Sequence, residues 1–325
     1  MLSEPGLEKK SIVKALAEDF LAVTQRAAIV SYPWIGKGRK NEADGAATES
    51  MRFHLNTMDM NAVIVIGEGE MDEAPMLFIG EKLGTGNGPE LDIAVDPVEG
   101  TTLMSTGQDN ALTVIAASEK GTLLHAPDMY MEKLAVGPKA KGSIDITLPL
   151  SENMISVAKA LGKNVSELTV MIQDRPRHEY LIKQVYETGG KVKLFSDVDI
   201  TGAVATALDD IDVDILVGTG GAPEGVIAAV ALKCLGGDFQ ARLIPQNQEE
   251  LDRCTRMGIV DPQAVLFMDD IVRSDQCLFA ATGITDGNFL KGIKKNQDGS
   301  LVCHSFIALG GNINSSKFIE GHYLT

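Results

Sequence analysis

Two short apolar segments of this chain each end in an acidic, glycine-containing turn, and this feature restricts the fold more than any other. Residues 62–66 read AVIVI and run directly into GEGE, and residues 91–95 read LDIAV and run into DPVEGTT. A compact apolar run that stops at a turn is typical of a buried strand. The pattern therefore predicts an α/β protein in which several carboxylates lie at the ends of strands.

The second half of the chain alternates between strand-like and helix-like segments. We expect strands at 168–172, 191–195, 213–217, 264–267 and 277–281. We expect helices between most of them, at 152–161, 178–188, 201–208, 224–235 and 248–256. Such alternation predicts right-handed crossovers and a mostly parallel sheet.

The length of the chain, 325 residues, favours two domains. Helical periodicity in the first half predicts helices over 12–27 and 43–55, and a further strand is expected at 111–117. A stretch rich in glycine, proline and lysine over 134–150 marks the change of domain. We therefore expect an N-terminal metal-binding domain over 1–150 and a C-terminal α/β substrate-binding domain over 151–325.

Composition excludes several classes of function. The formal net charge is −16, and basic residues occur only in short pairs such as Lys294-Lys295, which disfavours a nucleic-acid partner. The four cysteines form no CxxC pair, which favours buried thiols in a reducing compartment. No apolar run resembles a signal peptide or a membrane span, so we expect a cytoplasmic protein with no membrane partner.

The segment from Asp96 to Thr102 carries the clearest chemistry. Asp96 and Glu99 stand three residues apart at the end of an apolar strand, and hard divalent cations prefer such oxygen ligands. Gly100 leaves backbone N–H groups accessible to a phosphate. An acidic turn without function is the alternative for this segment alone. The second acidic turn, with Glu68, and Asp44 at an expected helix start together predict a shared two-metal site.

Seven segments of the sequence match one family when they are taken together. They read KNEADGAATESMR from Lys40, VIGEGEMDEAPML from Val65, DIAVDPVEGT from Asp92, HAPDMYMEKLAVGP from His125, DRPRH from Asp174, GGAPEG from Gly220 and ATGITDG from Ala281. From about residue 12 to His322 the chain resembles the class II, GlpX-type fructose-1,6-bisphosphatases, within the lithium-sensitive, metal-dependent sugar and inositol phosphatase superfamily. The joint presence of GEGEMDEAPM and APDMYMEK distinguishes this class from the inositol phosphatases.

The resemblance implies a fold and an activity. The fold is a layered αβαβα sugar-phosphatase architecture with two α/β domains and the site in the cleft between them. The activity is that of a phosphoric monoester hydrolase of gluconeogenesis, which converts fructose 1,6-bisphosphate into fructose 6-phosphate and phosphate. Two divalent cations, Mn²⁺ or Mg²⁺, and a homo-oligomer, a dimer or a tetramer, are implied as well. Hydrolysis of sedoheptulose 1,7-bisphosphate, alone or in addition, stays open.

The resemblance also implies roles for individual residues. The two metals are expected on Asp44, Glu68, Asp96, Glu99 and Glu224. Thr101 is expected to activate the attacking water or to attack itself, with Asp72 and Lys40 as helpers. Substrate contacts are expected at Glu99, Gly100, Thr101, Tyr130, Arg175, Pro176, Arg177, Asp197, Val198, Asp199 and Gly221. The family has Asp-Gly-Asp at 197–199, so Val198 implies either an extended backbone or a strained one at this loop.

Two rival functions remain on the sequence alone. Gly218-Thr219-Gly220-Gly221 follows an expected strand and opens an expected helix, as in a dinucleotide-binding oxidoreductase, with Asp238 further on. The spacing GxGG differs from the GxGxxG fingerprint, which disfavours this interpretation. A non-catalytic sugar-phosphate sensor on the same fold is the second rival, and the complete set of metal-type and hydroxyl residues argues against it.

Overall fold

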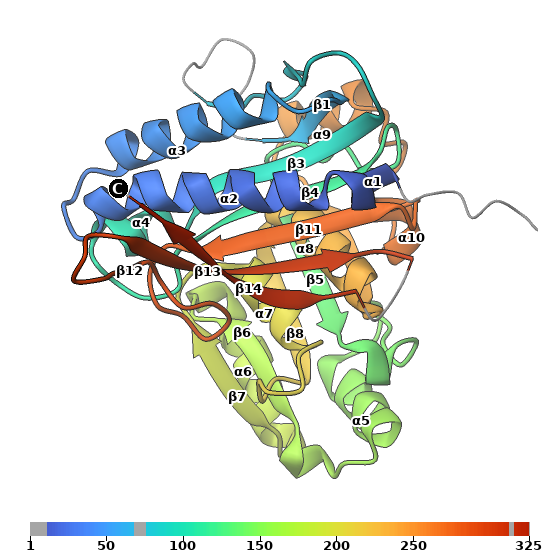
Figure 1. Cartoon of the computed structure of the whole chain (residues 1–325). Helices are drawn as coiled ribbons and strands as arrows, with labels where there is room; N and C mark the ends of the chain where they lie inside the picture. The colour runs from blue at the N-terminus through green and yellow to red at the C-terminus, as the bar shows by residue number, and fades with distance from the viewer. Residues whose placement is uncertain (1–11, 68–75, 312–314, 325) are drawn as a thin grey trace, which may run out of the picture.

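Two mixed β-sheets, with helices between them and on their outer faces, make up the chain (Figure 1). The computed structural model describes residues 12–67, 76–311 and 315–324. Within these residues, no helix is both long enough and apolar enough to cross a membrane.

The first sheet combines the two ends of the chain. Its strands are β1 (Asn61–Ile66), β2 (Lys82–Leu83), β3 (Glu90–Glu99), β4 (Leu112–Glu119), β11 (Cys277–Gly283), β12 (Lys294–Lys295), β13 (Leu301–Leu309) and β14 (Lys317–Tyr323). They lie in the order β12-β13-β11-β4-β3-β1-β2, and β14 also pairs with β13. Only β1 and β3 are parallel; the other pairs run antiparallel.

The second sheet is built from the middle of the chain. Its strands are β5 (Tyr130–Val136), β6 (Thr169–Gln173), β7 (Lys191–Phe195), β8 (Ile215–Gly221), β9 (Asp238–Ile244) and β10 (Leu266–Phe267), in the order β10-β9-β5-β8-β6-β7. The expectation of a mostly parallel sheet is wrong. β6 is parallel to β7 and β8, but β5 lies antiparallel between β8 and β9, and β9 is antiparallel to β10.

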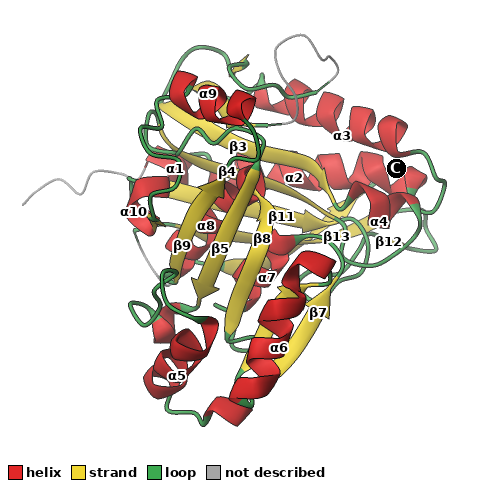
Figure 2. Cartoon of the chain, turned by 180° about the vertical axis from the view of Figure 1, so that it is seen from behind, coloured by secondary structure: helices red, strands yellow, loops and turns green. Residues whose placement is uncertain are grey.

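The helices form three layers around the two sheets. Their bounds are α1 (Ile12–Ala15), α2 (Ala17–Ser31), α3 (Lys40–Leu55), α4 (Thr101–Ser105), α5 (Leu150–Leu161), α6 (Glu179–Thr188), α7 (Asp199–Ala205), α8 (Ala222–Leu235), α9 (Gln248–Arg256) and α10 (Met268–Ile271). Helices α2 and α3 cover one face of the first sheet, and α5 and α6 lie on the far side of the second sheet (Figures 1 and 2). Helices α7 and α8 pack between the sheets.

Alternating side chains of the strands divide the core between these layers. Ile64 packs towards α2 and α3, whereas its neighbour Val65 packs towards α8. Leu134 of β5 likewise packs towards α5, and Ala135 packs towards α8. Because successive residues of a strand point to opposite faces, the central strands of each sheet are buried on both faces. The order of layers is helix, sheet, helix, sheet, helix, which confirms the expected αβαβα architecture.

Sequence periodicity located most helices and the short apolar strands, but not β5, β9, β13 and β14. Strand β5 carries Glu132 and Lys133 in its centre, and these polar residues interrupt the apolar pattern on which strand prediction depends. The sheets also divide the chain at points other than residue 150. The second sheet begins at Tyr130, and the strands after Cys277 return to the first sheet. The proposed division into two domains at residue 150 stays a prediction.

Candidate active site

The end of β3 is irregular, and this irregularity brings Asp96 and Glu99 together. The register of β3 against β4 shifts between these two residues. The backbone N–H of Val98 donates to Asp96 Oδ1 at 2.9 Å, which closes a tight turn through Pro97. A bulge of this kind redirects side chains at the end of a strand. The carboxyl of Glu99 consequently lies within hydrogen-bonding distance of Asp96.

Gly100 connects β3 to the short helix α4. Its φ of 83° lies in the left-handed region, which glycine adopts without strain. Thr101 follows as the first residue of α4, and its Oγ1 donates to the carbonyl oxygen of Val98 at 2.9 Å. Lys40, at the start of α3, donates from Nζ to Thr102 Oγ1 at 2.6 Å. The side chains of Lys40 and Thr102 thus join α3 to the turn that carries Thr101.

The second sheet and the central helices provide the opposite side of the site. Glu224 lies in the first turn of α8, and this helix begins directly after Gly221 at the end of β8. A Cβ atom on Gly221 would collide with the Glu224 carboxylate, so only glycine permits this arrangement. Asp199 begins α7, and Val198 precedes it with a φ of 75°. Of the two backbones open for this loop, the strained one is found, because a β-branched residue rarely adopts positive φ.

Six acidic groups from both halves of the molecule act on one another electrostatically. Burial and then the charge of Asp96 raise the pKa of Asp44 to about 6. Burial also raises the pKa of Asp96, where the hydrogen bonds from Glu99 and Val98 oppose the increase and the charge of Asp197 adds to it. Burial and Asp96 raise the pKa of Glu99 well above its usual range. Glu99 therefore holds a proton more tightly than an exposed glutamate does, because it is buried and Asp96 lies beside it.

Glu224 belongs to the same group of interacting carboxyls. Burial and then the charge of Asp199 raise the pKa of Glu224 to about 7, against the opposing charge of Lys133. Asp96 adds to this increase across the two halves of the molecule. Carboxyl groups that repel one another in a buried site attract either protons or cations.

Two oxygen atoms of this group are buried without a hydrogen-bond partner in the described part of the chain. They are Asp44 Oδ1 and Glu224 Oε2. Buried carboxylate oxygens normally have partners, so these atoms fit ligands of a hard divalent cation. No group of three or more His, Cys, Asp or Glu side chains that could hold a metal ion is found among residues 12–67, 76–311 and 315–324. Glu68 and Asp72, which the sequence assigns to the site, lie outside these residues.

The segment from Arg175 to Arg177 lies between β6 and α6, beside the start of β5. The guanidinium of Arg177 lies 5.1 Å from the centre of the Tyr130 ring, which is 45% exposed. Arg177 also donates to the carbonyl oxygen of Thr219 at 2.7 Å and to Gln173 Oε1 at 2.9 Å. Within the described part of the chain, Arg175 donates only to the carbonyl oxygen of Asp174, at 3.1 Å. The structure thus brings Tyr130 and Arg177 together, with Pro176 starting the 3₁₀ turn between the two arginines.

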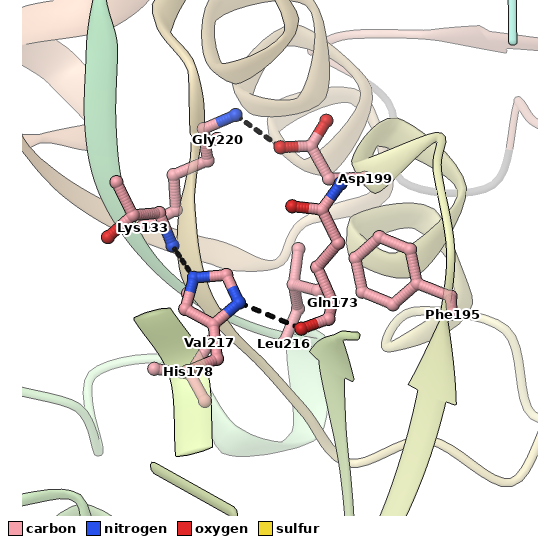
Figure 3. A pocket seen from close by; sticks show the side chains of 10 residues that line it. Lys133, Gln173, His178, Phe195, Asp199, Leu216, Val217 and Gly220 are labelled. Atoms are coloured by element: carbon pink, nitrogen blue, oxygen red, sulfur yellow. Dashed lines mark hydrogen bonds and ion pairs between the residues drawn. The ribbon is translucent and has the colours of Figure 1, made fainter. Parts of the chain in front are cut away.

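Two buried residues beside the site were missed by sequence reasoning. His178 accepts from the N–H of Thr219 at Nε2, 2.8 Å away, so its Nδ1–H donates to the carbonyl oxygen of Gln173, also at 2.8 Å (Figure 3). Burial lowers the pKa of His178 and keeps the ring neutral. Lys133, buried on β5, forms an ion pair with Asp199 (Figure 3). Both residues stand in the matched segments, but their partners are distant in sequence and left no local signal.

The last two glycines of β8 leave space for two carboxylates of the site. Cβ atoms on Gly220 and Gly221 would collide with the side chains of Asp199 and Glu224, respectively. Both glycines lie in strand β8, and Gly221 is also the residue before α8. They therefore do not form a separate phosphate-binding loop. Two carboxylates occupy the space in which a dinucleotide pyrophosphate would need hydrogen-bond donors, which argues against the oxidoreductase alternative.

Comparison with known proteins identifies the family. The family model described as bacterial fructose-1,6-bisphosphatase, glpX-encoded, matches residues 14–323. The Haemophilus influenzae protein named fructose-1,6-bisphosphatase class 2 is 49% identical, over 96% of this chain and 97% of its own length. The Escherichia coli K12 protein named fructose-1,6-bisphosphatase 1 class 2 is 46% identical, over 96% of each chain. A solved structure of the extragenic suppressor protein suhB from Bartonella henselae is 13% identical with a TM-score of 0.34, covering 59% of this chain and 73% of that one. The chain belongs to the family of bacterial, glpX-encoded fructose-1,6-bisphosphatases.

Proposed function

We propose that this protein hydrolyses the 1-phosphate of fructose 1,6-bisphosphate to give fructose 6-phosphate and phosphate. The observation that carries the proposal is the group of interacting carboxyls on Asp44, Asp96, Glu99 and Glu224, next to the turn of Gly100 and Thr101. The names of the relatives support the substrate. The reaction is hydrolysis of a phosphoric monoester, and the protein is an enzyme and not a sensor.

The turn after β3 is suited to hold the phosphate that is cleaved. Gly100 has no side chain to block the approach of phosphate oxygens, and the N–H groups at the start of α4 have no helical partners of their own. Thr101 Oγ1 is held 2.9 Å from the carbonyl oxygen of Val98, which fixes the direction of its proton. Rotation of the hydroxyl away from this carbonyl would let Thr101 donate its proton to a carboxylate of the site while its oxygen accepts a proton from an attacking water molecule.

The buried carboxyl groups are suitable ligands for divalent cations. We assign such cations to Asp44, Asp96, Glu99 and Glu224, with Glu68 as a further ligand. The orphaned oxygens Asp44 Oδ1 and Glu224 Oε2 support this assignment. Such cations supply neutralisation of phosphate charge and activation of water when bound. The carboxylates would hold these cations, and Glu99 and Glu224, whose pKa values are raised in the protein alone, would bind them in the ionised form. Mn²⁺ and Mg²⁺ are both proposed on the basis of the family.

The remainder of the substrate is proposed to lie against the second sheet. Arg175 keeps guanidinium donors that the protein does not engage in the described contacts, so it can grip the distant phosphate. Arg177 is stacked on Tyr130 and tied to Thr219, so it shapes the wall of this subsite. Asp197 and Asp199 accept hydrogen bonds from sugar hydroxyls in the same proposal.

The test is release of phosphate from a panel of sugar monophosphates and bisphosphates, with Mn²⁺, with Mg²⁺ and after chelation. Fructose 1,6-bisphosphate should be cleaved with either cation, and chelation should abolish the activity. Sedoheptulose 1,7-bisphosphate is included, because the seven-carbon sugar is the alternative substrate. Full activity in the chelated protein would contradict the cation assignment, and no release from fructose 1,6-bisphosphate would contradict the function. A cytoplasmic homo-oligomer, a dimer or a tetramer, completes the proposal.

A further inference from the structure

Lys133 is a charged residue in the interior of the protein. It lies in the centre of β5, between β8 and β9, and its side chain is 3% exposed. Nζ donates to Asp199 Oδ2, so the charge is compensated by one carboxylate (Figure 3). Burial of an ammonium group costs free energy unless the group is paired, so the ion pair with Asp199 stabilises Lys133 in this buried position.

Two glycines leave the space that the Lys133 side chain occupies. A Cβ atom on Gly220 of β8 would lie 3.2 Å from Lys133 Nζ. A Cβ atom on Gly225 of α8 would lie 3.1 Å from Lys133 Cε. Strands β5 and β8 and helix α8 thus jointly fix the direction of this side chain, and the ammonium can reach Asp199 at the start of α7.

The pair divides the acidic residues of the site into two kinds. Asp44 and Glu224 each have a buried oxygen without a partner in the described part of the chain. Asp199 has a resident cation of its own in Lys133. The same ammonium also acts on Glu224, where burial and Asp199 raise the pKa and Lys133 lowers it, so Lys133 lies within electrostatic range of the proposed metal ligands.

We propose that Lys133 is a positioning residue that reserves Asp199 for the sugar by keeping its carboxylate out of the set of metal ligands. Lys133 engages Oδ2, which leaves Oδ1 to accept from a sugar hydroxyl. Without the ammonium, Asp199 would be an uncompensated carboxylate beside Glu99 and Glu224, and a divalent cation would attract it. The inference rests on the proposed function, in which Asp199 contacts the substrate.

The test is a double-mutant cycle with two readouts. Calorimetry measures the Kd for Mn²⁺ without substrate, and steady-state kinetics measure KM and kcat for fructose 1,6-bisphosphate. Lys133→Met removes a positive charge and frees Asp199, so Mn²⁺ should bind about tenfold more tightly. The KM should rise about tenfold, because Asp199 is no longer oriented, with a smaller effect on kcat. A residue that only supports folding would weaken metal and substrate binding together.

The other variants of the cycle test whether the effect of Lys133 on Mn²⁺ binding depends on Asp199. Asp199→Asn leaves the ammonium uncompensated and should weaken Mn²⁺ binding, whereas the double variant should return the Kd to the wild-type value with a high KM. Lys139→Met, at an exposed ion pair with Asp209, is the control and should change neither quantity. Weaker or unchanged Mn²⁺ binding in Lys133→Met overturns the proposal.

If Lys133→Met does not fold, Asp199→Asn decides alone, and unchanged or tighter Mn²⁺ binding overturns the proposal. The Mn²⁺ titrations need no turnover. They therefore separate failure of this inference from failure of the proposed hydrolysis, which wild-type kinetics test.

Discussion

Val198 packs directly on Gly100, and both residues have a left-handed backbone. A Cβ atom on Gly100 would lie 2.9 Å from Val198 Cγ2, and the two φ angles are 83° for Gly100 and 75° for Val198. The contact joins the turn before Thr101 to the loop before Asp199. The phosphate side and the sugar side of the proposed site thus meet through one valine methyl group, and Val198 is buried there to 2% exposure.

The backbone at Val198 predicts an unusual order of stability among variants. Val198→Ala and Val198→Gly both lose the buried isopropyl group, but only glycine adopts positive φ without strain. We expect Val198→Gly to be more stable than Val198→Ala by about 1 kcal/mol, as measured by chemical denaturation. Equal stability, or a more stable alanine variant, would show that the loop has an ordinary backbone.

The same glycine variant should alter recognition of the sugar. Loss of the valine methyl groups changes the space beside Asp197 and Asp199, so we expect a changed KM for six-carbon and seven-carbon bisphosphates. The dependence on Mn²⁺ should stay as in the wild type. An unchanged KM for both sugars would remove Asp197 and Asp199 from the substrate site.

Thr101→Ala should lower kcat by about 10²–10⁴, because the hydroxyl is proposed to act on the attacking water. Thr101→Ser keeps the hydroxyl and should retain most of the activity. Thr106→Ala is the matched control, since the Thr106 hydroxyl donates to the carbonyl oxygen of Thr102 at 2.8 Å, just after the same short helix. Thermal unfolding should be similar for all three variants. A near-normal kcat in Thr101→Ala would assign activation of water to other groups.

Arg175 and Arg177 should differ in what their loss does. Arg175→Ala should raise the KM for fructose 1,6-bisphosphate about tenfold or more, leave p-nitrophenyl phosphate hydrolysis nearly unchanged, and not affect stability. Arg177→Ala should raise the KM similarly but also lower the melting temperature, because Arg177 ties Thr219 to Gln173. Arg256→Ala, at the exposed end of α9, is the control. Equal losses on both substrates would place either arginine at the reacting centre.

The raised pKa values predict how the metal-free protein responds to pH. Asp44 and Glu224 have pKa values of about 6 and about 7 in the folded state, above the 3.8 and 4.5 of the ordinary groups. The folded state therefore binds more protons than the unfolded state between these values, and the contribution to stability is lost as pH rises to about 7. Glu224→Gln, which mimics the protonated form, should stabilise the metal-free protein at pH 8 by about 1–3 kcal/mol and much less at pH 5.

Denaturation of the metal-free protein at several pH values measures this effect. Glu249→Gln, an exposed acid in the first turn of α9, should show no such pH-dependent gain. His178 acts in the opposite direction, since its lowered pKa removes stability as pH falls below 6.5, so variants must be compared with the wild type at each pH. Mn²⁺ should abolish the advantage of the glutamine. An equal gain at both pH values would show that Glu224 is not protonated at low pH.

Local sequence pattern reaches only part of this structure. Apolar runs locate β1, β3, β6 and β11, and the acidic turn after β3 identifies Asp96 and Glu99, because a strand end and its carboxylates are adjacent in sequence. Strand β5 is invisible to the pattern, since Lys133 is stabilised by Asp199, 66 residues away. The role of His178 depends on Thr219 in the same way. Long-range pairs of this kind can be found only once the sheet order is known.

Helix α8 has almost no surface of its own. From Gly225 to Leu232 every residue is buried, and most are alanine or valine. The helix lies between the two sheets and starts with Glu224, so the width of these small side chains sets how far Glu224 stands from Asp96. A bulkier residue at Ala228 or Ala231 would widen the gap between Glu224 and Asp96 without lying in the proposed site itself. The thickness of one helix thus sets the spacing of two proposed metal ligands.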